Sequence, residues 1–281
     1  RSDQSWDVAL TWQAHLSGAP ALSAALTGSN RAVDLDSTGR SVNLADSLNG
    51  IRSAMDVAHD ASGYRYVLDA VGSQIRRFDA NGASMVFADS SDGLLFPTSL
   101  ATAADGSVYV TNYLTDQVIR ISASGQGSVF SQGSKGLSDP FGVAVAPDGT
   151  VYVAEVDVHR VMRLDANGNA TVFADASDGL TTPTSLTFGP DGKLYVVDTY
   201  QSIVFRFDAA GNASIYADYR SGLLFPTGLA FDAAGDLFVS QYLSGQILEI
   251  NPFNQGTVLA SGLQGVWGLD VPIPSTYAFD R

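Results

Sequence analysis

The sequence predicts an all-β fold, a six-bladed β-propeller built of four-stranded antiparallel blades. Three observations support this prediction: a 43-residue repeat, short strand-like segments within each repeat, and no sustained helical periodicity. The repeat is clearest in a set of equally spaced glycines: Gly50, Gly93, Gly136, Gly179, Gly222 and Gly265. A turn position keeps the same spacing: Asp36, Asp79, Ser122, Asp165, Asp208 and Asn251.

Each repeat is expected to supply four strands, as the unit that begins at Gly136 illustrates. Residues 141–146 and 151–155 flank the turn PDG and should form a hairpin, and residues 161–164 and 170–174 flank the turn DANGN. Segments such as VMRLD alternate apolar and polar residues, which is typical of half-buried strands. An isolated blade would expose apolar surface on both faces, so neighbouring blades must cover it, and a closed ring leaves no blade uncovered.

Residues 1–281 are expected to form one propeller domain, with repeats near 7–49, 50–92, 93–135, 136–178, 179–221 and 222–264. Two segments compete for the innermost strand of the first blade. TWQAHL (11–16) lies in frame and supplies Trp12, whereas VWGLDV (266–271) supplies Trp267. We favour a closing strand at 265–272, followed by a tail at 273–281, because this pairing ties both ends of the chain together. A continuous first blade is the alternative.

The composition argues against several classes of function. A net charge of −14, with 15 scattered Lys and Arg residues, argues against binding to nucleic acid. The sequence has no run of about 18 apolar residues, which is the length that a membrane-spanning helix needs. Cysteine is absent, which excludes disulfides, thiol nucleophiles and cysteinyl metal sites.

The segment PFGVAVAPDGTVYVAEVDVHRV (140–161) resembles the NHL repeat. The resemblance implies a propeller, and it implies little about function, because such propellers include interaction modules, sensor domains and a few lyases and hydrolases. The tail VPIPSTYAFDR is faintly similar to the Pro-Glu-Pro sorting tails of exported bacterial proteins. We therefore expect an extracellular or periplasmic protein.

A polar residue ends the second strand of five successive units: Asp69, Asn112, Glu155, Asp198 and Gln241. We favour a capping role, in which these side chains accept hydrogen bonds from loop amides, and a structural corner for His159 and Arg160. The alternative is that the five side chains hold a hard cation such as Ca²⁺ through oxygen ligands. In an enzyme, Glu155 or Asp198 could serve as a general base or metal ligand. No cofactor is evident from the sequence.

The fold also resembles six-bladed lactonases of the gluconolactonase kind, which implies a metal site at the start of the innermost strands. The matching positions hold weak ligands: Met55, Thr98, Phe141, Thr184, Thr227 and, approximately, Trp267. A lactonase-type reaction is therefore not expected. A streptogramin-lyase reaction would require a pair of histidines and an acid near the channel, and the sequence has only His15, His59 and His159. We expect His59 to be a packed residue of an innermost strand.

The expected ligand site is a small polar and aromatic pocket at the channel mouth, on the face with the longer loops. Its candidate residues are Thr98, Tyr113, Thr184, Tyr200, Thr227, Tyr242 and Trp267. Phe96 and Phe225, in the repeated LLFPT, are expected to cover loop roots, and the acidic loops favour basic peptides, amines or Ca²⁺. The sequence thus predicts an exported binding propeller whose partner is a protein, a peptide or a small molecule. A lyase or hydrolase active at the central channel, with or without a divalent metal, is the alternative.

Overall fold

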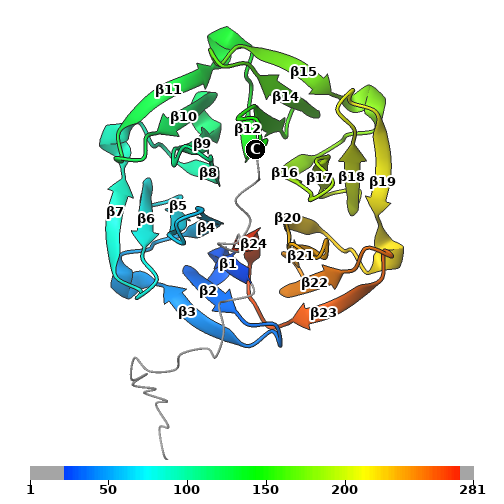
Figure 1. Ribbon diagram of the computed structural model, residues 1–281, viewed down its shortest axis with the longest axis horizontal. Helices are drawn as coiled ribbons and strands as arrows, with labels where there is room; N and C mark the ends of the chain where they lie inside the picture. Colours follow the sequence, from blue (N-terminus) through cyan, green and yellow to red (C-terminus); the bar gives the residue numbers. More distant parts are fainter. Residues whose placement is uncertain (1–21, 273–281) are drawn as a thin grey trace, which may run out of the picture.

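Strands of five or six residues, separated by tight turns, build six four-stranded antiparallel sheets that stand around a central channel (Figure 1). The computed structural model describes residues 22–272. Within each sheet the strands follow one another from the channel outward. The predicted six-bladed propeller is confirmed.

The first three blades contain, from the innermost strand to the outermost, the following elements. The first blade contains β24 (Val266–Asp270), β1 (Leu22–Leu26), β2 (Arg31–Leu35) and β3 (Ser41–Ala45). The second contains β4 (Ala54–His59), β5 (Arg65–Asp69), β6 (Gln74–Phe78) and β7 (Ser84–Ala88). The third contains β8 (Pro97–Thr102), β9 (Val108–Asn112), β10 (Gln117–Ile121) and β11 (Gly127–Gln132).

The remaining blades repeat the same arrangement. The fourth contains β12 (Pro140–Val145), β13 (Val151–Glu155), β14 (Arg160–Leu164) and β15 (Ala170–Ala174). The fifth contains β16 (Pro183–Phe188), β17 (Leu194–Asp198), β18 (Ile203–Phe207) and β19 (Ala213–Ala217). The sixth contains β20 (Pro226–Phe231), β21 (Leu237–Gln241), β22 (Gln246–Ile250) and β23 (Gly256–Ala260).

The ring is closed by the last strand of the described chain. β24 pairs antiparallel with β1, with Ser23 opposite Asp270 and Leu26 opposite Val266. The favoured closing strand therefore fills the innermost position of the first blade. The competing segment at 11–16, which includes Trp12, lies outside the described residues.

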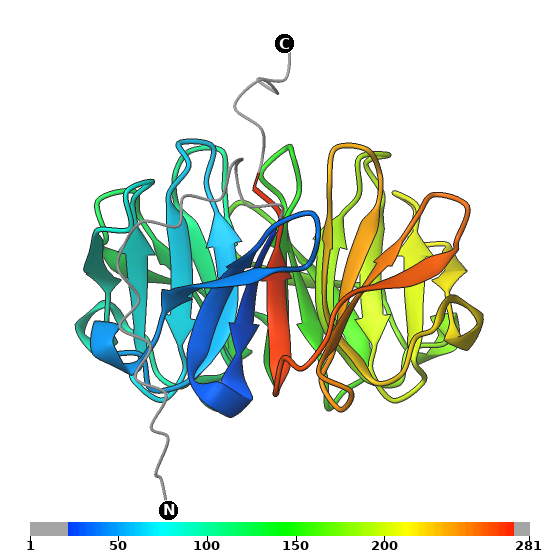
Figure 2. The same cartoon turned by 90° about the horizontal axis from the view of Figure 1, so that it is seen from below.

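The two ends of the ring differ (Figure 2). At the turn face, tight turns join the third strand of each blade to the fourth and, in every blade but the first, the first strand to the second. At the loop face lie the connections between blades and the loops between second and third strands, with seven three-residue 3₁₀ segments in residues 22–272. These are η1 (Thr27–Ser29), η2 (Ser47–Asn49), η3 (Ser90–Asp92), η4 (Tyr113–Thr115), η5 (Gly133–Lys135), η6 (Ala176–Asp178) and η7 (Tyr219–Ser221).

Side chains at the turn face explain why the sequence repeats there. At all six predicted turn positions the side chain accepts the backbone amide of the residue four places on, as Asp165 does from Asn169 at 2.9 Å. Such bonds satisfy amides that the strands leave unpaired. At the loop face, Gly93, Gly136 and Gly179 adopt φ of 93°, 102° and 99°, a left-handed conformation that glycine adopts without steric cost.

The hydrophobic core is distributed over the junctions between blades. One cluster of buried apolar side chains lies at each of the six junctions. The junction between the sixth and first blades holds Phe238 and Ile247 together with Leu22 and Leu269. Because every junction is packed, the inner strands are held rigidly around the channel. No helix within residues 22–272 is long and apolar enough to cross a membrane.

Candidate functional site

Aromatic side chains from opposite blades meet across the channel at the loop face. Phe141, near the start of β12, and Trp267, near the start of β24, come from opposite blades, yet their ring centroids lie 5.8 Å apart. Tyr113 packs edge-on against Phe141 at 6.1 Å, and Tyr242 packs against Trp267 at 5.3 Å. We call Tyr113, Phe141, Tyr242 and Trp267 the aromatic plug.

The three predicted threonines join strands instead of lining an opening. Thr98 donates to the Phe141 carbonyl of the next blade at 2.9 Å, and Thr227 donates to the Val266 carbonyl at 3.2 Å. Thr184 exchanges a hydrogen bond with Thr199 at 2.6 Å. All three threonines are buried. Their role in binding a ligand stays a prediction.

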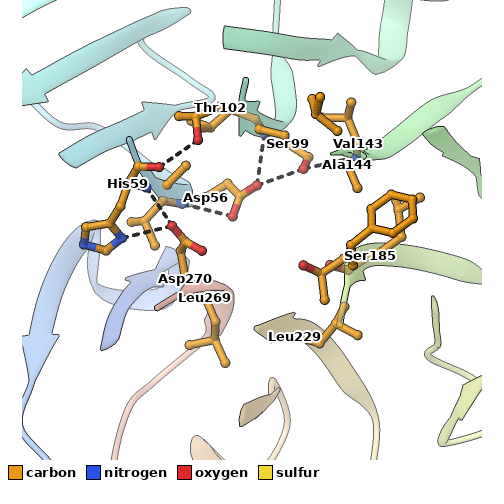
Figure 3. A pocket seen from close by; sticks show the side chains of 18 residues that line it. Asp56, His59, Ser99, Thr102, Val143, Ala144, Ser185, Leu229, Leu269 and Asp270 are labelled. Atoms are coloured by element: carbon orange, nitrogen blue, oxygen red, sulfur yellow. Dashed lines mark hydrogen bonds and ion pairs between the residues drawn. The ribbon is translucent and has the colours of Figure 1, made fainter. Parts of the chain in front are cut away.

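A channel pocket lies at the turn-face end of the channel, at the opposite end from the expected ligand site. Its volume is about 190 Å³, and it is lined by the second halves of the innermost strands (Figure 3). Polar lining side chains include Asp56, His59, Ser99, Thr102, Ser185 and Asp270. The pocket lies at the turn-face end of these strands, away from the aromatic plug. The expected ligand site at the loop-face mouth stays a prediction.

Asp56 is the central polar group of the channel pocket. Its carboxylate accepts hydrogen bonds from the Ser99 hydroxyl at 2.8 Å and from the amides of Leu100 and Val57 at 3.0 and 2.9 Å. Gly268 of β24 packs directly against it, since a Cβ there would lie 2.0 Å from the carboxylate. Burial among the inner strands raises the pKa of Asp56 to about 7; the three hydrogen bonds act in the opposite direction, and the charge of Asp270 adds to the rise.

A buried polar network runs outward from the pocket. His59 Nδ1 lies 2.9 Å from Asp270 Oδ2, and His59 Nε2 lies 3.2 Å from Ser23 Oγ. Ser23 donates its hydroxyl hydrogen to Asp34 at 2.5 Å, and Asp34 also accepts from Arg65 at 2.6 Å. Both ring nitrogens of His59 therefore have an oxygen atom within hydrogen-bond distance. His59 is packed in an innermost strand as expected, and it also bonds across two blades.

Ser23, His59 and Asp270 are connected in the order of a serine hydrolase triad. The Ser23 side chain is fully buried, however, and its hydrogen is directed to Asp34. A nucleophile must reach a substrate and give its proton to the histidine. This set therefore holds the closing strand to the second blade and has no exposed nucleophile.

The five polar residues that end the second strands cap the loops that enter their own blades. Asp198 accepts from the Thr181 and Thr182 amides at 2.6 and 2.9 Å, and Asp69 accepts from Arg52 and Ser53. Asn112 and Gln241 accept from the amides of Leu95 and Leu224. Each of the five is buried against its own loop. Their arrangement matches the favoured capping role.

Glu155 repeats this geometry with a basic partner. It accepts from the Ser138 amide at 2.6 Å and from Arg160, which also donates to the Gly136 carbonyl at 3.1 Å. Burial raises the pKa of Glu155, and Arg160 and Ser138 limit the rise. His159 lies exposed in the adjoining loop, with φ of 57°. Within residues 22–272, no three His, Cys, Asp or Glu side chains gather as a metal site would require.

Sequence reasoning missed Asp56 and Asp270, although a signal was present. Asp56 occupies the repeat position that holds Ser99, Gly142, Ser185 and Gly228 in other blades, so it is the ionisable exception at that level of the channel. The comparison with lactonases tested the neighbouring positions, one residue earlier. Adjacent residues of a strand point to opposite faces. The comparison at Met55 therefore gave no information about the side chain of Asp56, one residue later.

The fold and the pocket together define a six-bladed propeller with a polar pocket in its channel. The chain belongs to the virginiamycin B lyase family, whose model matches residues 53–259. The expected NHL resemblance holds at the level of the propeller class. The sequence analysis considered only the reaction of a streptogramin lyase, and it did not assign the chain to this family.

Solved structures share the fold at low sequence identity. A structure described as streptogramin B lyase is 16% identical, with a TM-score of 0.62, over 79% of this chain and 70% of that chain. A chain of a nidogen/laminin complex is 17% identical, with a TM-score of 0.77, over 90% of this chain and 98% of that chain. A catalytically inactive histidine-to-alanine variant of virginiamycin B lyase from Staphylococcus aureus, with quinupristin, is 16% identical, with a TM-score of 0.64, over 83% and 78%. No curated protein matches this chain in sequence.

Proposed function

We propose that this chain is a binding propeller that holds a small organic cation, such as a protonated amine, in the channel pocket. The supporting observation is that Asp56 has no basic partner among the described residues. Within residues 22–272 its hydrogen-bond partners are a hydroxyl and two amides, and no basic side chain bonds to it. Asp270, by contrast, already has His59 as a partner. A cationic ligand would supply the positively charged partner that the neighbouring side chains do not give to Asp56.

The size and lining of the pocket favour a small ligand. Pockets for drug-sized molecules have volumes of about 300–1,000 Å³, and the channel pocket has about 190 Å³. Ser99 offers a hydroxyl beside the carboxylate, Ser185 offers one across the pocket, and Leu229 and Leu269 offer apolar contact (Figure 3). This combination suits a short ammonium compound with a few methylene groups.

Isothermal titration calorimetry with methylammonium, choline and 1,4-diaminobutane tests the proposal, with glycerol and acetate as neutral and anionic probes. We expect at least one cation to bind and the two other probes not to bind. Asp56→Asn should weaken cation binding at least tenfold, whereas Asp148→Asn, on an exposed turn of the same face, should leave it unchanged. Equal binding of glycerol, or an unchanged affinity in Asp56→Asn, would contradict the proposal.

A second candidate is a lyase-type reaction at the same pocket, which the family membership and one observation favour. A carboxyl group whose pKa is about 7 can act as acid or base near neutral pH, and Asp56 is such a group. In the described residues, however, His59 and His159 lie in different blades and at opposite faces. His15 lies outside them.

Incubation with quinupristin, followed by liquid chromatography, tests this second candidate. Conversion that Asp56→Asn abolishes, while the variant keeps the melting temperature of the wild type, would support it. Unchanged quinupristin, or conversion that the variant retains, would count against it. We also propose an extracellular or periplasmic location, which the sorting-tail likeness supports and which fractionation of the producing cells would test.

A further inference from the structure

Two phenylalanines at the loop face adopt a backbone conformation that bulky residues rarely adopt. Phe96 and Phe225, each just before an innermost strand, have φ of 50° and 53°. Asp139 holds the equivalent position in the fourth blade, with φ of 50°. Asp and Asn tolerate this left-handed region, whereas for other residues it costs about 1–2 kcal/mol. The same corner could therefore be built without phenylalanine.

The two side chains differ in burial, since Phe96 is exposed and Phe225 is half-buried. Phe96 remains 46% exposed, and Phe225 packs edge-on against Tyr200 at 5.5 Å, which is itself 74% exposed. Both corners are held by their amides, which donate to Ser73 Oγ at 3.3 Å and Ser202 Oγ at 3.0 Å. Strain that persists at an exposed side chain without a packing benefit is typical of binding surfaces. The expected role as covers of loop roots stays a prediction.

The two phenylalanines are parts of a wider apolar surface. They precede β8 and β20, in blades on opposite sides of the ring, and the aromatic plug lies between them at the channel mouth (Figure 1). Exposed leucines flank both corners and the neighbouring loops: Leu95, Leu114, Leu224 and Leu243. The loop face therefore presents apolar groups across its width and the aromatic plug at its centre.

Carboxylates accompany these apolar groups. The Tyr113 hydroxyl donates to Asp157 at 2.6 Å, and this bond, with the charges of Asp157, Asp139 and Asp116, raises the pKa of Tyr113 to about 12. Asp116 and Asp139 are themselves joined at the corner, where the Asp139 amide donates to Asp116 at 2.8 Å. Negative charge on an aromatic and aliphatic surface complements a partner that carries both basic and apolar side chains.

We propose that the loop face docks a positively charged, aromatic-containing segment of a partner protein, with Phe96, Phe225 and the aromatic plug as its apolar contacts. A second copy of this chain is a poor occupant, because each copy carries a net charge of −14. The surface is distinct from the channel pocket, which lies at the turn-face end of the channel.

Fluorescence anisotropy with labelled peptides tests this proposal. The probes are an alternating Arg-Trp hexapeptide, a Glu-Trp hexapeptide with reversed charge and an Arg-Ser hexapeptide without aromatic groups. The double variant Phe96→Asn, Phe225→Asn removes the apolar contacts and relieves the strain. The matched control, Val129→Asn with Ile215→Asn, changes two apolar residues on the outermost strands β11 and β19 whose exposure is similar to that of Phe96.

We expect the Arg-Trp peptide to bind wild type more tightly than either other peptide, and to bind more weakly in 0.5 M salt. The double variant should bind it at least tenfold more weakly, with a melting temperature equal to or above that of wild type. The control variant should bind as wild type does. Asp56→Asn should also leave peptide binding unchanged, which separates this surface from the channel pocket.

Several results would overturn the proposal. These are no preference for the Arg-Trp peptide, equal binding by the double variant, or a melting temperature that falls in the double variant, which would make the phenylalanines structural. Light scattering that shows a dimer of wild type, lost in the double variant, would assign the face to a second copy. Binding to vesicles of anionic lipid that exceeds binding of the peptide would assign it to a membrane surface.

Discussion

At the scale of single residues, the charge state of Asp56 governs the proposed binding. A carboxyl group with a pKa of about 7 is ionised above that pH and neutral below it. At pH 8 about nine-tenths of the groups carry the charge, and at pH 6 about one-tenth do. We therefore expect the affinity of the channel pocket for ammonium probes to fall about tenfold between pH 8 and pH 6, as calorimetry at each pH would measure. An affinity that is constant over this range would remove Asp56 from the site.

His59 is expected to contribute to stability, because it bonds to Asp270 and Ser23 inside the protein. His59→Leu suits the apolar surroundings, since other blades place Val145 or Phe188 there. It removes the imidazole partner of Asp270 and Ser23, while Asp270 keeps the amide of residue 59 and Ser23 keeps Asp34. We expect the free energy of unfolding to fall by about 1–3 kcal/mol. Urea denaturation at pH 7 measures this loss.

The matched control is Arg120→Met, which breaks the exposed pair of Arg120 with Asp105 at 2.7 Å. Exposed pairs contribute less than about 1 kcal/mol. Equal losses in the two variants would show that the buried network adds nothing beyond a surface ion pair.

At the scale of elements, the polar residues that end the second strands hold the loops that lead into the innermost strands of their own blades. Asp198→Ala removes the acceptor for two amides and the Thr181 hydroxyl. We expect a loss of about 1–3 kcal/mol in the free energy of unfolding. Addition of CaCl₂ should not change the melting temperature of wild type or of Asp198→Ala, because each acceptor already binds amides of its own loop. A melting temperature that rises with Ca²⁺ in wild type and not in Asp198→Ala would instead show a metal site.

The closing strand β24 connects the two ends of the described chain. It pairs with β1, supplies Trp267 to the plug and places Asp270 beside His59. A chain that ends at residue 264 leaves β1 without its inner neighbour, and we expect it to lose cooperative unfolding as monitored by circular dichroism. A synthetic peptide of residues 265–272 should restore it, whereas a scrambled peptide should not. Cooperative unfolding of the truncated chain alone would show that closure by this strand is dispensable.

At the scale of the whole molecule, sequence reasoning succeeded where the repeat carried the information. Equally spaced turn residues such as Asp165 and corner residues such as Glu155 do the same job in every blade, so their spacing predicts blade number and strand order. The site depends on departures from the repeat. Asp56 breaks the pattern at one inner strand, and Phe141 meets Trp267 only because opposite blades face each other across the channel.

This difference explains why the channel pocket at the turn face was not expected. A register position states how far along a strand a residue lies, and it does not state which side chains reach the axis and meet there. Of the aromatic residues expected at the loop face, Tyr113 packs against Phe141 and Tyr242 against Trp267, and these two rings meet across the channel. The strain at Phe96 could not be read from sequence, because it is a property of the backbone.

The central claim is that a cation pairs with Asp56 in the channel pocket, and carbon-13 NMR of the Asp56 carboxyl group tests it most directly. Titration without ligand should give a pKa near 7. With saturating 1,4-diaminobutane we expect a clear fall in that pKa, because a bound ammonium group favours the ionised carboxylate. A pKa near the ordinary value for aspartate without ligand, or one that saturating ligand leaves unchanged, would contradict the claim.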